Sequence, residues 1–447
     1  MSEKMRDSGV DWIGEIPEGW EVTKIKFSTT LNGRIGWQGL TSSEYQTEGP
    51  YLITGTDFSN GQINFATAVH IENHRWEEAK HIQIKNGDLL ITKDGTVGKV
   101  AIVTNLNDKA SLNSGVLKIQ PKPEIYTKFL YYVLISEEFW LWFNYTNSGA
   151  STILHLYQNV FDEFSYAIPL DIRQQKFIAN YLDKQTSKFD QAQKLLKDEI
   201  ERLRAYKKSL IYETVTKGLD KNVQFKDSGV DWIGEIPVGW EVSKLKFLSE
   251  GKLQYGANVE GVDFDKKLPR YIRITDITGD NKLKEKGKQS LPRDIATPYL
   301  LQKGDILFAR SGATVGKTFL FESEESAAFA GYLIKFTPNQ EKVDSKFVFY
   351  MTLGYGYENW KNSIFSQATI QNIGADKYGE LKIAMPSLVE QLDIVKFLDE
   401  KTKKIDKIIK IKEEQVINLL KQQKNLIYEM VTGKKNIELG ISNGSNG

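Results

Sequence analysis

The residues most suggestive of chemistry form a glycine-containing segment that occurs twice. Residues 311–318, SGATVGKT, nearly fit the pattern G-x-x-x-x-G-K-[S/T], whose backbone and lysine hold nucleotide phosphates. The first position is Ser311 instead of glycine, and the related segment at residues 93–100, KDGTVGKV, has Val100 where a magnesium-binding hydroxyl belongs. We therefore expect a glycine turn between two strands. A further interpretation keeps this turn and directs its threonine and lysine side chains at DNA phosphate.

The sequence gives little support for a nuclease, a methyltransferase or a metal site. Asp88 with Lys93 suggests a nuclease, but the counterpart is Asp305 with Arg310, and arginine cannot act as a proton-accepting base. A solvated turn is the alternative. The methyltransferase motif Asn/Asp-Pro-Pro-aromatic is absent, since no Pro-Pro pair occurs. A zinc site needs three or four ligands, and the only histidines are His70, His74, His81 and His155. We expect a chain without catalysis, without a metal and without a bound cofactor.

Three pairs of polar clusters have side chains suited to DNA. The first is the glycine turn, where small residues permit close approach and lysine or hydroxyl groups suit phosphate. Its candidates are Lys93, Thr96 and Lys99, matched by Arg310, Thr314 and Lys317. In the second pair, arginine can bind the two acceptors of guanine, although an Arg273–Asp276 surface pair is the alternative. Its candidates are Thr54 and Thr56 on one side, and Arg270, Arg273 and Thr275 on the other.

The third pair is a polar stretch ahead of each long helix. Glutamine and asparagine suit the edges of adenine, and ordinary helix capping is the competing explanation. The candidates are Ser151 and Thr152 in the first half, and Gln367, Thr369 and Gln371 in the second.

These clusters lie in a chain whose sequence contains a long internal repeat. Residues 7–27, DSGVDWIGEIPEGWEVTKIKF, return at 227–247 as DSGVDWIGEIPVGWEVSKLKF, with three differences. GDLLITKDGTVGKV (87–100) returns as GDILFARSGATVGKT (304–318), and IYETVTKG (211–218) as IYEMVTGK (427–434). A repeat of about 220 residues predicts two whole domains, each followed by its own helix. A DNA-reading surface should differ between the halves, so the repeated Trp12, Trp20, Trp232 and Trp240 are expected in the core or facing a partner.

A long helix with few breakers closes each half. Each is expected to run about 38 residues, roughly 57 Å, between a proline (Pro169, Pro386) and a glycine (Gly218, Gly433). Apolar residues recur every seven positions, which is typical of a coiled-coil seam. In the first helix these are Leu182, Phe189, Leu196, Leu203 and Leu210, with Ala192, Ile200 and Tyr206 between them. In the second they are Leu398, Ile405, Leu419 and Leu426, and Lys412 interrupts the row.

The composition sets the class of protein. Of 447 residues, 40% are hydrophobic and 11% aromatic, which indicates folded domains. The chain has no cysteine, so a reducing cytoplasm is the expected location. Its start, MSEKMRDSGVDW, lacks the apolar core of a signal peptide. The net charge of +1 gives no global support for DNA binding, so any nucleic-acid surface must be local.

The layout of domain, helix, domain and helix resembles the specificity subunits of type I restriction-modification systems. The resemblance covers nearly the whole chain and is carried by several motifs together. These are IPxGW at 16–20 and 236–240, the GD…TxGK turns, PSLVEQLDIVKFLDEKTKKID at 386–406, and LIYE at 210–213 and 426–429. The first half departs from this pattern at its helix start, PLDIRQQKFIANYLDKQTSKFD, at 169–190.

The resemblance implies an α+β fold with two mixed α/β target-recognition domains and two long helices packed as an antiparallel coiled coil. The expected boundaries are 1–168 and 218–385 for the domains, 169–217 and 386–434 for the helices, and 435–447 for a flexible tail. The resemblance also implies that each domain reads one half of a split, asymmetric site in double-stranded DNA. The helices are expected to set the spacing and to dock two modification subunits.

The expected partners bring the cofactors. In the family, modification subunits methylate adenine at N6 with S-adenosylmethionine, and ATP-dependent restriction subunits complete the nuclease. The magnesium and nucleotide sites are then expected on these partners. Two rival interpretations are a self-contained nuclease or ATPase built on the glycine turn, and a purely structural coiled-coil adaptor without DNA contact.

Overall fold

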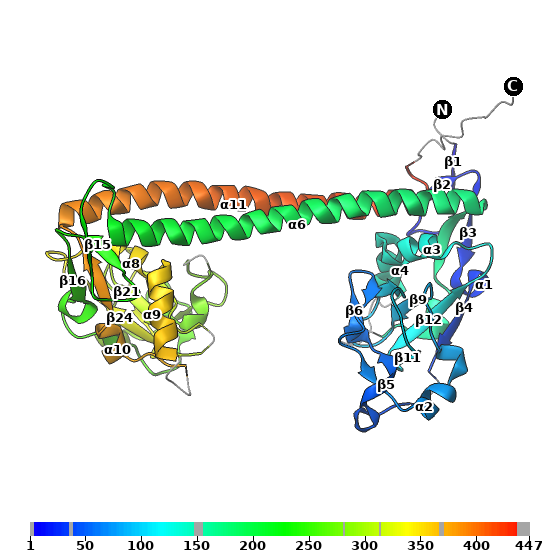
Figure 1. The fold of residues 1–447 in the computed structure, drawn as a ribbon, viewed down its shortest axis with the longest axis horizontal. Helices are drawn as coiled ribbons and strands as arrows, with labels where there is room; N and C mark the ends of the chain where they lie inside the picture. The colour runs from blue at the N-terminus through cyan, green and yellow to red at the C-terminus, as the bar shows by residue number, and fades with distance from the viewer. Residues whose placement is uncertain are drawn as a thin grey trace. The chain divides into compact units, whose positions relative to one another are not determined.

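A computed structural model describes residues 4–34, 39–146, 155–279, 282–312, 314–365 and 371–435. The chain folds into two compact units. One contains Met1–Leu196 and Glu414–Gly447, and the other contains Lys197–Glu413. Each unit therefore combines one globular domain with parts of both long helices, α6 (Ile172–Lys217) and α11 (Leu388–Val431), shown in Figure 1.

The first domain is built on a four-stranded antiparallel sheet in the order β10-β9-β12-β4. Its strands are β10 (Val100–Ile102), β9 (Leu89–Thr92), β12 (Val116–Pro121) and β4 (Thr29–Gly33). A three-stranded sheet has the order β11 (Ala110–Leu112), β5 (Gln46–Ile53) and β8 (Val69–His70). Three two-stranded pairs are β1 (Met5–Asp7) with β2 (Glu15–Pro17), β3 (Trp20–Lys24) with β13 (Ser165–Pro169), and β6 (Phe58–Ser59) with β7 (Gln62–Ile63). The helices are α1 (Ile25–Ser28), α2 (Asn73–Glu77), α3 (Thr127–Ile135), α4 (Glu137–Thr146) and α5 (Gln158–Phe161).

The second domain repeats this framework. Its main antiparallel sheet has the order β17-β24-β21-β22, with β17 (Gln254–Tyr255), β24 (Leu333–Phe336), β21 (Ile306–Ala309) and β22 (Thr318–Leu320). A second sheet has the order β18 (Val262–Asp263), β20 (Gln289–Ser290), β19 (Arg270–Ile272) and β23 (Ala327–Phe329). The pairs are β14 (Phe225–Asp227) with β15 (Glu235–Pro237) and β16 (Glu241–Lys244) with β25 (Lys382–Met385). The helices are α7 (Arg293–Ala296), α8 (Ser345–Met351), α9 (Tyr355–Phe365) and α10 (Ala375–Gly379).

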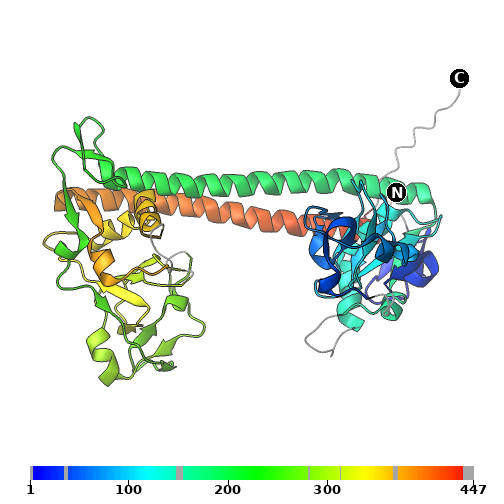
Figure 2. The ribbon, with the colours of Figure 1, turned by 60° about the horizontal axis from the view of Figure 1, so that its bottom comes forward.

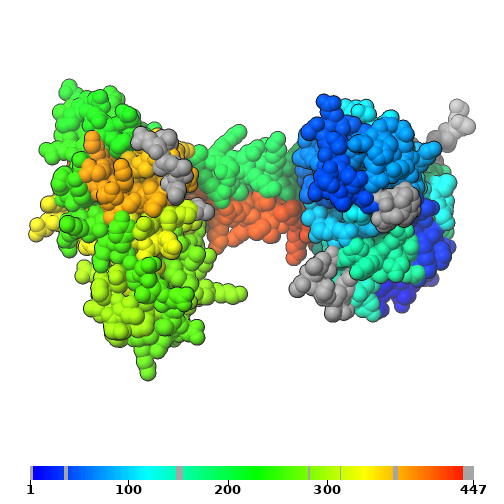
Figure 3. Space-filling view, turned by 90° about the horizontal axis from the view of Figure 1, so that it is seen from below, coloured from blue at the N-terminus to red at the C-terminus, as the bar shows by residue number. Residues whose placement is uncertain are grey.

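Short 3-10 turns complete both domains. They are η2 (Ser42–Glu44), η3 (Gly55–Asp57) and η4 (Lys80–Ile82) in the first domain, and η5 (Leu245–Phe247), η6 (Ile274–Asp276) and η7 (Thr297–Tyr299) in the second. Figure 3 shows the surface of each domain coloured by residue number, blue to teal for the first and green to orange for the second.

The two long helices pack against each other within each unit. In the first unit, Gln193 Nε2 donates a hydrogen bond to Gln423 Oε1 at 3.0 Å. In the second unit, Lys207 Nζ lies 2.6 Å from Asp406 Oδ1. The start of α6 thus pairs with the end of α11, and the end of α6 with the start of α11, which makes the pair antiparallel (Figure 2). Together with the mixed domains, this confirms the expected fold class.

The helices are longer than the sequence suggested. They contain 46 and 44 residues, because the first turns after Pro169 and Pro386 are already helical. Helix α6 ends directly before Gly218, and α11 ends two residues before Gly433. These glycines have φ +74° and +71°, a conformation that ends helices.

Every predicted seam residue is buried or half-buried. Leu182 and Leu398 are fully buried, Ile405 and Leu426 nearly so, and the other seam leucines and Phe189 are half-buried. Tyr206, expected between the seam positions, is instead 56% exposed. Lys412, which interrupts the row, lies beside Glu199 of α6, so an ion pair replaces an apolar layer there.

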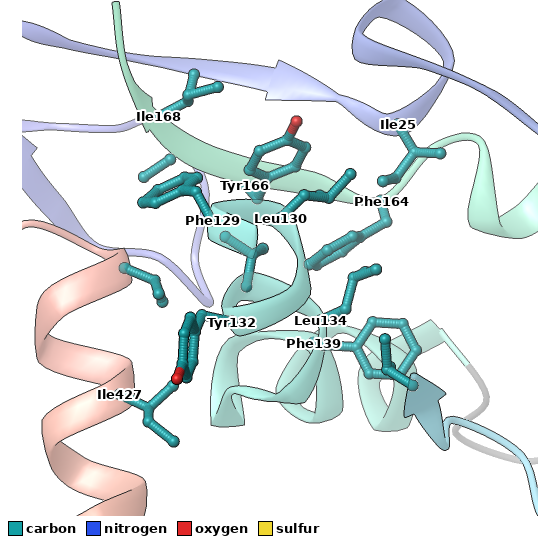
Figure 4. Packing of buried hydrophobic residues seen from close by; sticks show 14 of the residues in the cluster. Ile25, Phe129, Leu130, Tyr132, Leu134, Phe139, Phe164, Tyr166, Ile168 and Ile427 are labelled. Atoms are coloured by element: carbon teal, nitrogen blue, oxygen red, sulfur yellow. The ribbon is translucent and has the colours of Figure 1, made fainter. Parts of the chain in front are cut away.

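Each domain core is completed by a helix end from the other half of the sequence. In the first unit, Ile427, Met430 and Val431 of α11 belong to the core of the first domain, and Figure 4 shows Ile427 beside Tyr132 of α3. In the second unit, Ile211 and Val215 of α6 join the corresponding core. The repeated tryptophans belong to these cores: Trp20 and Trp240 are 2% and 3% exposed, and Trp12 and Trp232 pack against the clusters.

Candidate nucleic-acid interface

The two glycine segments are tight loops between antiparallel strands. Residues 93–99 join β9 to β10, and residues 310–317 join β21 to β22. Gly98 and Gly316, both with φ +80°, donate matching backbone hydrogen bonds to Thr92 O and Ala309 O, at 2.9 and 2.8 Å. A nucleotide-binding loop of this pattern leads from a strand into a helix. Since both segments lead into strands, the expected glycine turn is confirmed and the nucleotide loop is wrong.

The aspartates that precede these turns hold the sheets together. Asp305 is 1% exposed and accepts hydrogen bonds from Gln302 N at 2.8 Å and Thr337 Oγ1 at 2.6 Å. Asp88 pairs with Lys118 of β12 at 2.8 Å, with both side chains about one-tenth exposed or less. The interpretation of Asp88 and Asp305 as members of solvated turns is wrong, because Asp305 is buried, Asp88 is half-buried, and both carboxylates bind groups of their own sheet. Neither carboxylate contacts the candidate nuclease lysine or arginine.

In the first domain, the structure brings two predicted clusters together. The turn around Gly55 lies against the glycine turn: Thr96 Oγ1 and Lys99 Nζ donate to Gly55 O at 3.3 and 3.4 Å. Thr54 caps the Gly55 turn, where its backbone N–H donates to the buried Asp57 carboxylate at 2.8 Å. The exposed hydroxyls of Thr56 and Thr96 and the ammonium of Lys99 therefore share one surface.

The third cluster of the first domain is described only in part. Ser151 and Thr152 lie outside the described residues. Directly after them, Leu156 N donates to Lys93 O at 2.9 Å, and the His155 ring contacts the Asp94 carboxylate. Tyr157, which the sequence did not single out, is 60% exposed and lies 4.2 Å from the His155 ring, centroid to centroid. Its only sequence signal is its position beside the polar stretch.

In the second domain, two of the predicted arginines are occupied by internal partners. Arg273 donates to Asp276 through Nε at 3.0 Å and Nη2 at 2.8 Å, and to Gln289 Oε1 at 2.7 Å. Arg270 is 8% exposed and donates to Glu285 at 3.2 Å and to the backbone carbonyl of Lys284. The Arg273–Asp276 alternative is therefore present. Thr275, between them, is exposed.

The third predicted arginine is held differently. The Arg310 guanidinium lies over the Tyr255 ring at 4.8 Å, and its Nε is buried without a hydrogen-bond partner. Its backbone is fixed on both sides, because Arg310 N donates to Tyr332 O at 3.0 Å and Ile373 N donates to Arg310 O at 2.9 Å. Tyr255 and Tyr332 are 41% and 61% exposed.

The remaining candidates of the second domain flank Arg310. Thr314 is exposed on the glycine turn, and Lys317 Nζ donates to Ile277 O at 3.0 Å, as Lys99 does to Gly55 O in the first domain. Gln371 is exposed beside Asn372, which forms a β-bridge with Ser311. Gln367 and Thr369 lie outside the described residues.

Two buried tyrosines donate hydrogen bonds to the glycine turn of the second domain and to the strand that precedes it. Tyr357 Oη donates to Gly316 O at 2.9 Å and Tyr378 Oη donates to Ala309 O at 2.8 Å. Burial raises the pKa of both phenols above their ordinary value, so they remain protonated hydrogen-bond donors. The loop that carries Arg310 is consequently anchored by the core.

Comparison with known proteins identifies the family. The model of the type I restriction modification DNA specificity domain matches residues 38–202 and again residues 237–421, which together exceed half of the chain. The chain belongs to this family. Specificity subunits are the non-catalytic members of type I systems, which confirms the expectation of a non-enzymatic chain.

Relatives of similar length support this assignment. The chain is 27% identical over 429 residues to the type I restriction enzyme MjaVIII specificity subunit of Methanocaldococcus jannaschii, covering 94% of this chain and 93% of that protein. It is 22% identical to the EcoBI specificity subunit of Escherichia coli, covering 95% and 87%. A chain of a solved type I restriction-modification assembly has the same fold, with a TM-score of 0.70, 16% identity, and coverage of 94% and 99%.

The described residues form neither a membrane-spanning helix nor a metal-binding cluster. No helix there is long and apolar enough to cross a membrane. No group of three or more histidine, cysteine, aspartate or glutamate side chains in the described part could hold a metal ion.

Proposed function

We propose that this specificity subunit reads a bipartite, asymmetric site in double-stranded DNA, with one half of the site bound by each domain. One observation carries the proposal. The two domains place the same loop on the same strands, yet side chains beside that loop differ between them. Lys93 and Arg310 occupy equivalent positions, each fixed by backbone hydrogen bonds of the same pattern. A shared framework with different side chains beside the loop suits two readers of different bases.

The long helices have a separate proposed role. A stiff helix, unlike a flexible linker, holds the domains that it joins at a set separation. We assign to α6 and α11 the spacing of the two half-sites and the docking of two methyltransferase subunits, one for each repeated half. Restriction subunits would complete the assembly. S-adenosylmethionine, ATP and Mg²⁺ would then belong to these partners, and the cysteine-free chain would work in the reducing cytoplasm.

A domain exchange tests the proposal. Residues 28–168 are replaced by the equivalent segment of a relative, and the methylated sequences of the host genome are determined. We expect one half of the target to change while the other half stays the same. A change in both halves would contradict the two-reader model.

The rival functions have their own tests. Turnover of ATP or cleavage of DNA by the purified chain with Mg²⁺ would favour a self-contained enzyme. Sequence-specific, salt-dependent binding by the assembled complex would remove the purely structural adaptor.

A further inference from the structure

The positions around the glycine turns fall into two classes when the domains are compared by strand register. Some are shared: Lys99 and Lys317 each donate to a carbonyl of the neighbouring turn, and Thr96 and Thr314 are both exposed. Phosphates are the same on every DNA, so shared lysines and threonines suit phosphate contact. Positions that read bases must differ between domains with different targets.

Arg310 and Tyr255 are two contacting residues of the second domain whose counterparts in the first domain are different residues. Arg310 replaces Lys93, and Tyr255 replaces Gly33, because Tyr255 pairs with Ile334 on β24 as Gly33 pairs with Leu117 on β12. The arginine and the ring on which it lies thus occur together in the second domain and are both missing from the first. The Tyr255 hydroxyl accepts a hydrogen bond from Ala375 N at 2.9 Å, which fixes the ring.

The guanidinium of Arg310 is prepared to bind an acceptor outside the domain. Among the described residues it has no carboxylate partner, whereas Arg270 and Arg273 are paired with Glu285 and Asp276. Its Nε is buried, so the donors left for a ligand are the N–H groups on the two terminal nitrogens. A planar fork of this kind matches the O6 and N7 acceptors of guanine in the major groove.

We infer that Arg310, held on the Tyr255 ring, recognises a guanine in the half-site of the second domain, and that the first domain lacks this contact. The inference rests on the proposed function and names one base of its target. A phosphate could also accept from this fork. Guanine is favoured because a phosphate contact gives no reason for the arginine and its ring to differ between the domains.

The test uses the complete chain assembled with its modification subunits. Affinity is measured at one fixed salt concentration for the natural target and for duplexes with each base pair replaced in turn. For the wild type, replacing one G·C pair of one half-site should weaken binding roughly 10- to 100-fold. R310K keeps the charge but loses the fork, so it should bind the natural and replaced duplexes within about threefold of each other. Its preferences in the other half-site should not change.

Two matched variants separate the alternatives. K317A should weaken binding to all duplexes by a similar factor, as loss of a phosphate contact does. Tyr255→Leu keeps Arg310 but removes the ring, and should reduce the guanine preference without removing it. A thermal melt like that of the wild type shows that each variant is folded.

Three results would overturn the inference. They are a second half-site that tolerates every replacement of G·C, an R310K variant that retains the guanine preference, and an R310K variant that loses affinity equally for all duplexes. A wild-type complex with no sequence preference in either half would instead refute the proposed function itself.

Discussion

Tyr350 in α8 donates its phenolic hydrogen to Asp399 in α11, with 2.6 Å between Oη and Oδ1. The first domain contains the same contact, in which Tyr132 in α3 donates to Asp183 in α6 at 2.9 Å. In both places a threonine one turn along the long helix lies 3.2 Å from the tyrosine oxygen. The duplication has therefore retained the hydrogen bonds that fix each domain on its helix.

Removing this hydroxyl should loosen the junction between domain and helix. Tyr350→Phe leaves the ring in place and removes one hydrogen bond to a charged acceptor, which should lower the free energy of unfolding by about 1.5–3 kcal/mol. Tyr132→Phe should lower the free energy of unfolding by a similar amount. Calorimetric melting of the full chain measures the effect, and Tyr206→Phe is the control because Tyr206 is 56% exposed. Equal melting temperatures for all three variants would contradict the role given to this contact.

The helix seam predicts a contrast between neighbouring leucines. Leu419 is half-buried in the seam, and Leu420 is 41% exposed. Leu419→Asp should place an unpaired carboxylate between the helices, costing about 2–3 kcal/mol, and Leu203→Asp should do the same in the second unit. Both variants should also fail to co-purify with the modification subunit. Leu420→Asp should melt close to the wild type, and normal stability of Leu419→Asp would argue against the seam.

A buried carboxyl group predicts a pH dependence. Glu138 in α4 is fully buried, and the groups that oppose its desolvation are the backbone N–H of Ala167 and the ammonium of Lys434. Burial raises the pKa of Glu138 to about 8. The folded chain thus holds this proton more tightly than the unfolded chain. The contribution of protonated Glu138 to the free energy of unfolding is therefore complete at low pH and is lost as pH rises from about 4.5 to 8.

Glu138→Gln should remove this dependence, since glutamine resembles the protonated acid and does not titrate. The stability of the variant relative to the wild type should increase by up to about 1.4 kcal/mol per pH unit across this window. Thermal melts of both proteins at pH 5 and pH 8.5 supply the comparison. A difference that is the same at both pH values would show that Glu138 is ionised in the folded chain.

The proposed spacing role predicts the result of lengthening both helices. Four residues inserted after Lys197 and four after Glu413 add about 6 Å to each helix and nearly restore the seam, since they make about one turn. On DNA this corresponds to one or two base pairs at about 3.4 Å each. Methylome sequencing should therefore show a longer spacer between unchanged half-sites. Two-residue insertions should rotate the seam residues out of the interface between the helices and abolish assembly. If the four-residue variant kept full activity with an unaltered spacer, the helices would not set the spacing of the half-sites.

The sequence predicted what depends on local patterns and repetition. The internal repeat, the heptad spacing from Leu182 to Leu210 and the glycines after each helix were sufficient to predict the fold class. The helices were underestimated because their first turns face the domains as well as the seam. The burial of Asp88 could not be predicted, since it depends on Lys118, thirty residues later on another strand.

The candidate site was harder to predict, because polar side chains can bind their own protein as well as DNA. Arg273 looked suited to guanine, but Gln289 and the Gly287 carbonyl bind it internally. Arg310 was predicted only as a phosphate contact on the glycine turn, because its ring partner Tyr255 lies 55 positions earlier, on another strand. The retained pairs Asp183/Asp399 and Thr186/Thr402 are visible in the repeat, and this joint retention is a signal that was not used to predict their contacts.

The completion of each core by a distant helix end has a consequence for biosynthesis. The ribosome releases the first domain long before it makes Ile427, Met430 and Val431, which belong to that domain's core. Until residues 427–431 emerge, the apolar surface that these side chains cover stays open to solvent or to other chains. The corresponding residues of the second domain, Ile211 and Val215, are available as soon as that domain is synthesised, because they precede it in the chain. The half that is synthesised first is therefore the last to finish folding, and a nascent chain interrupted before α11 leaves that surface uncovered.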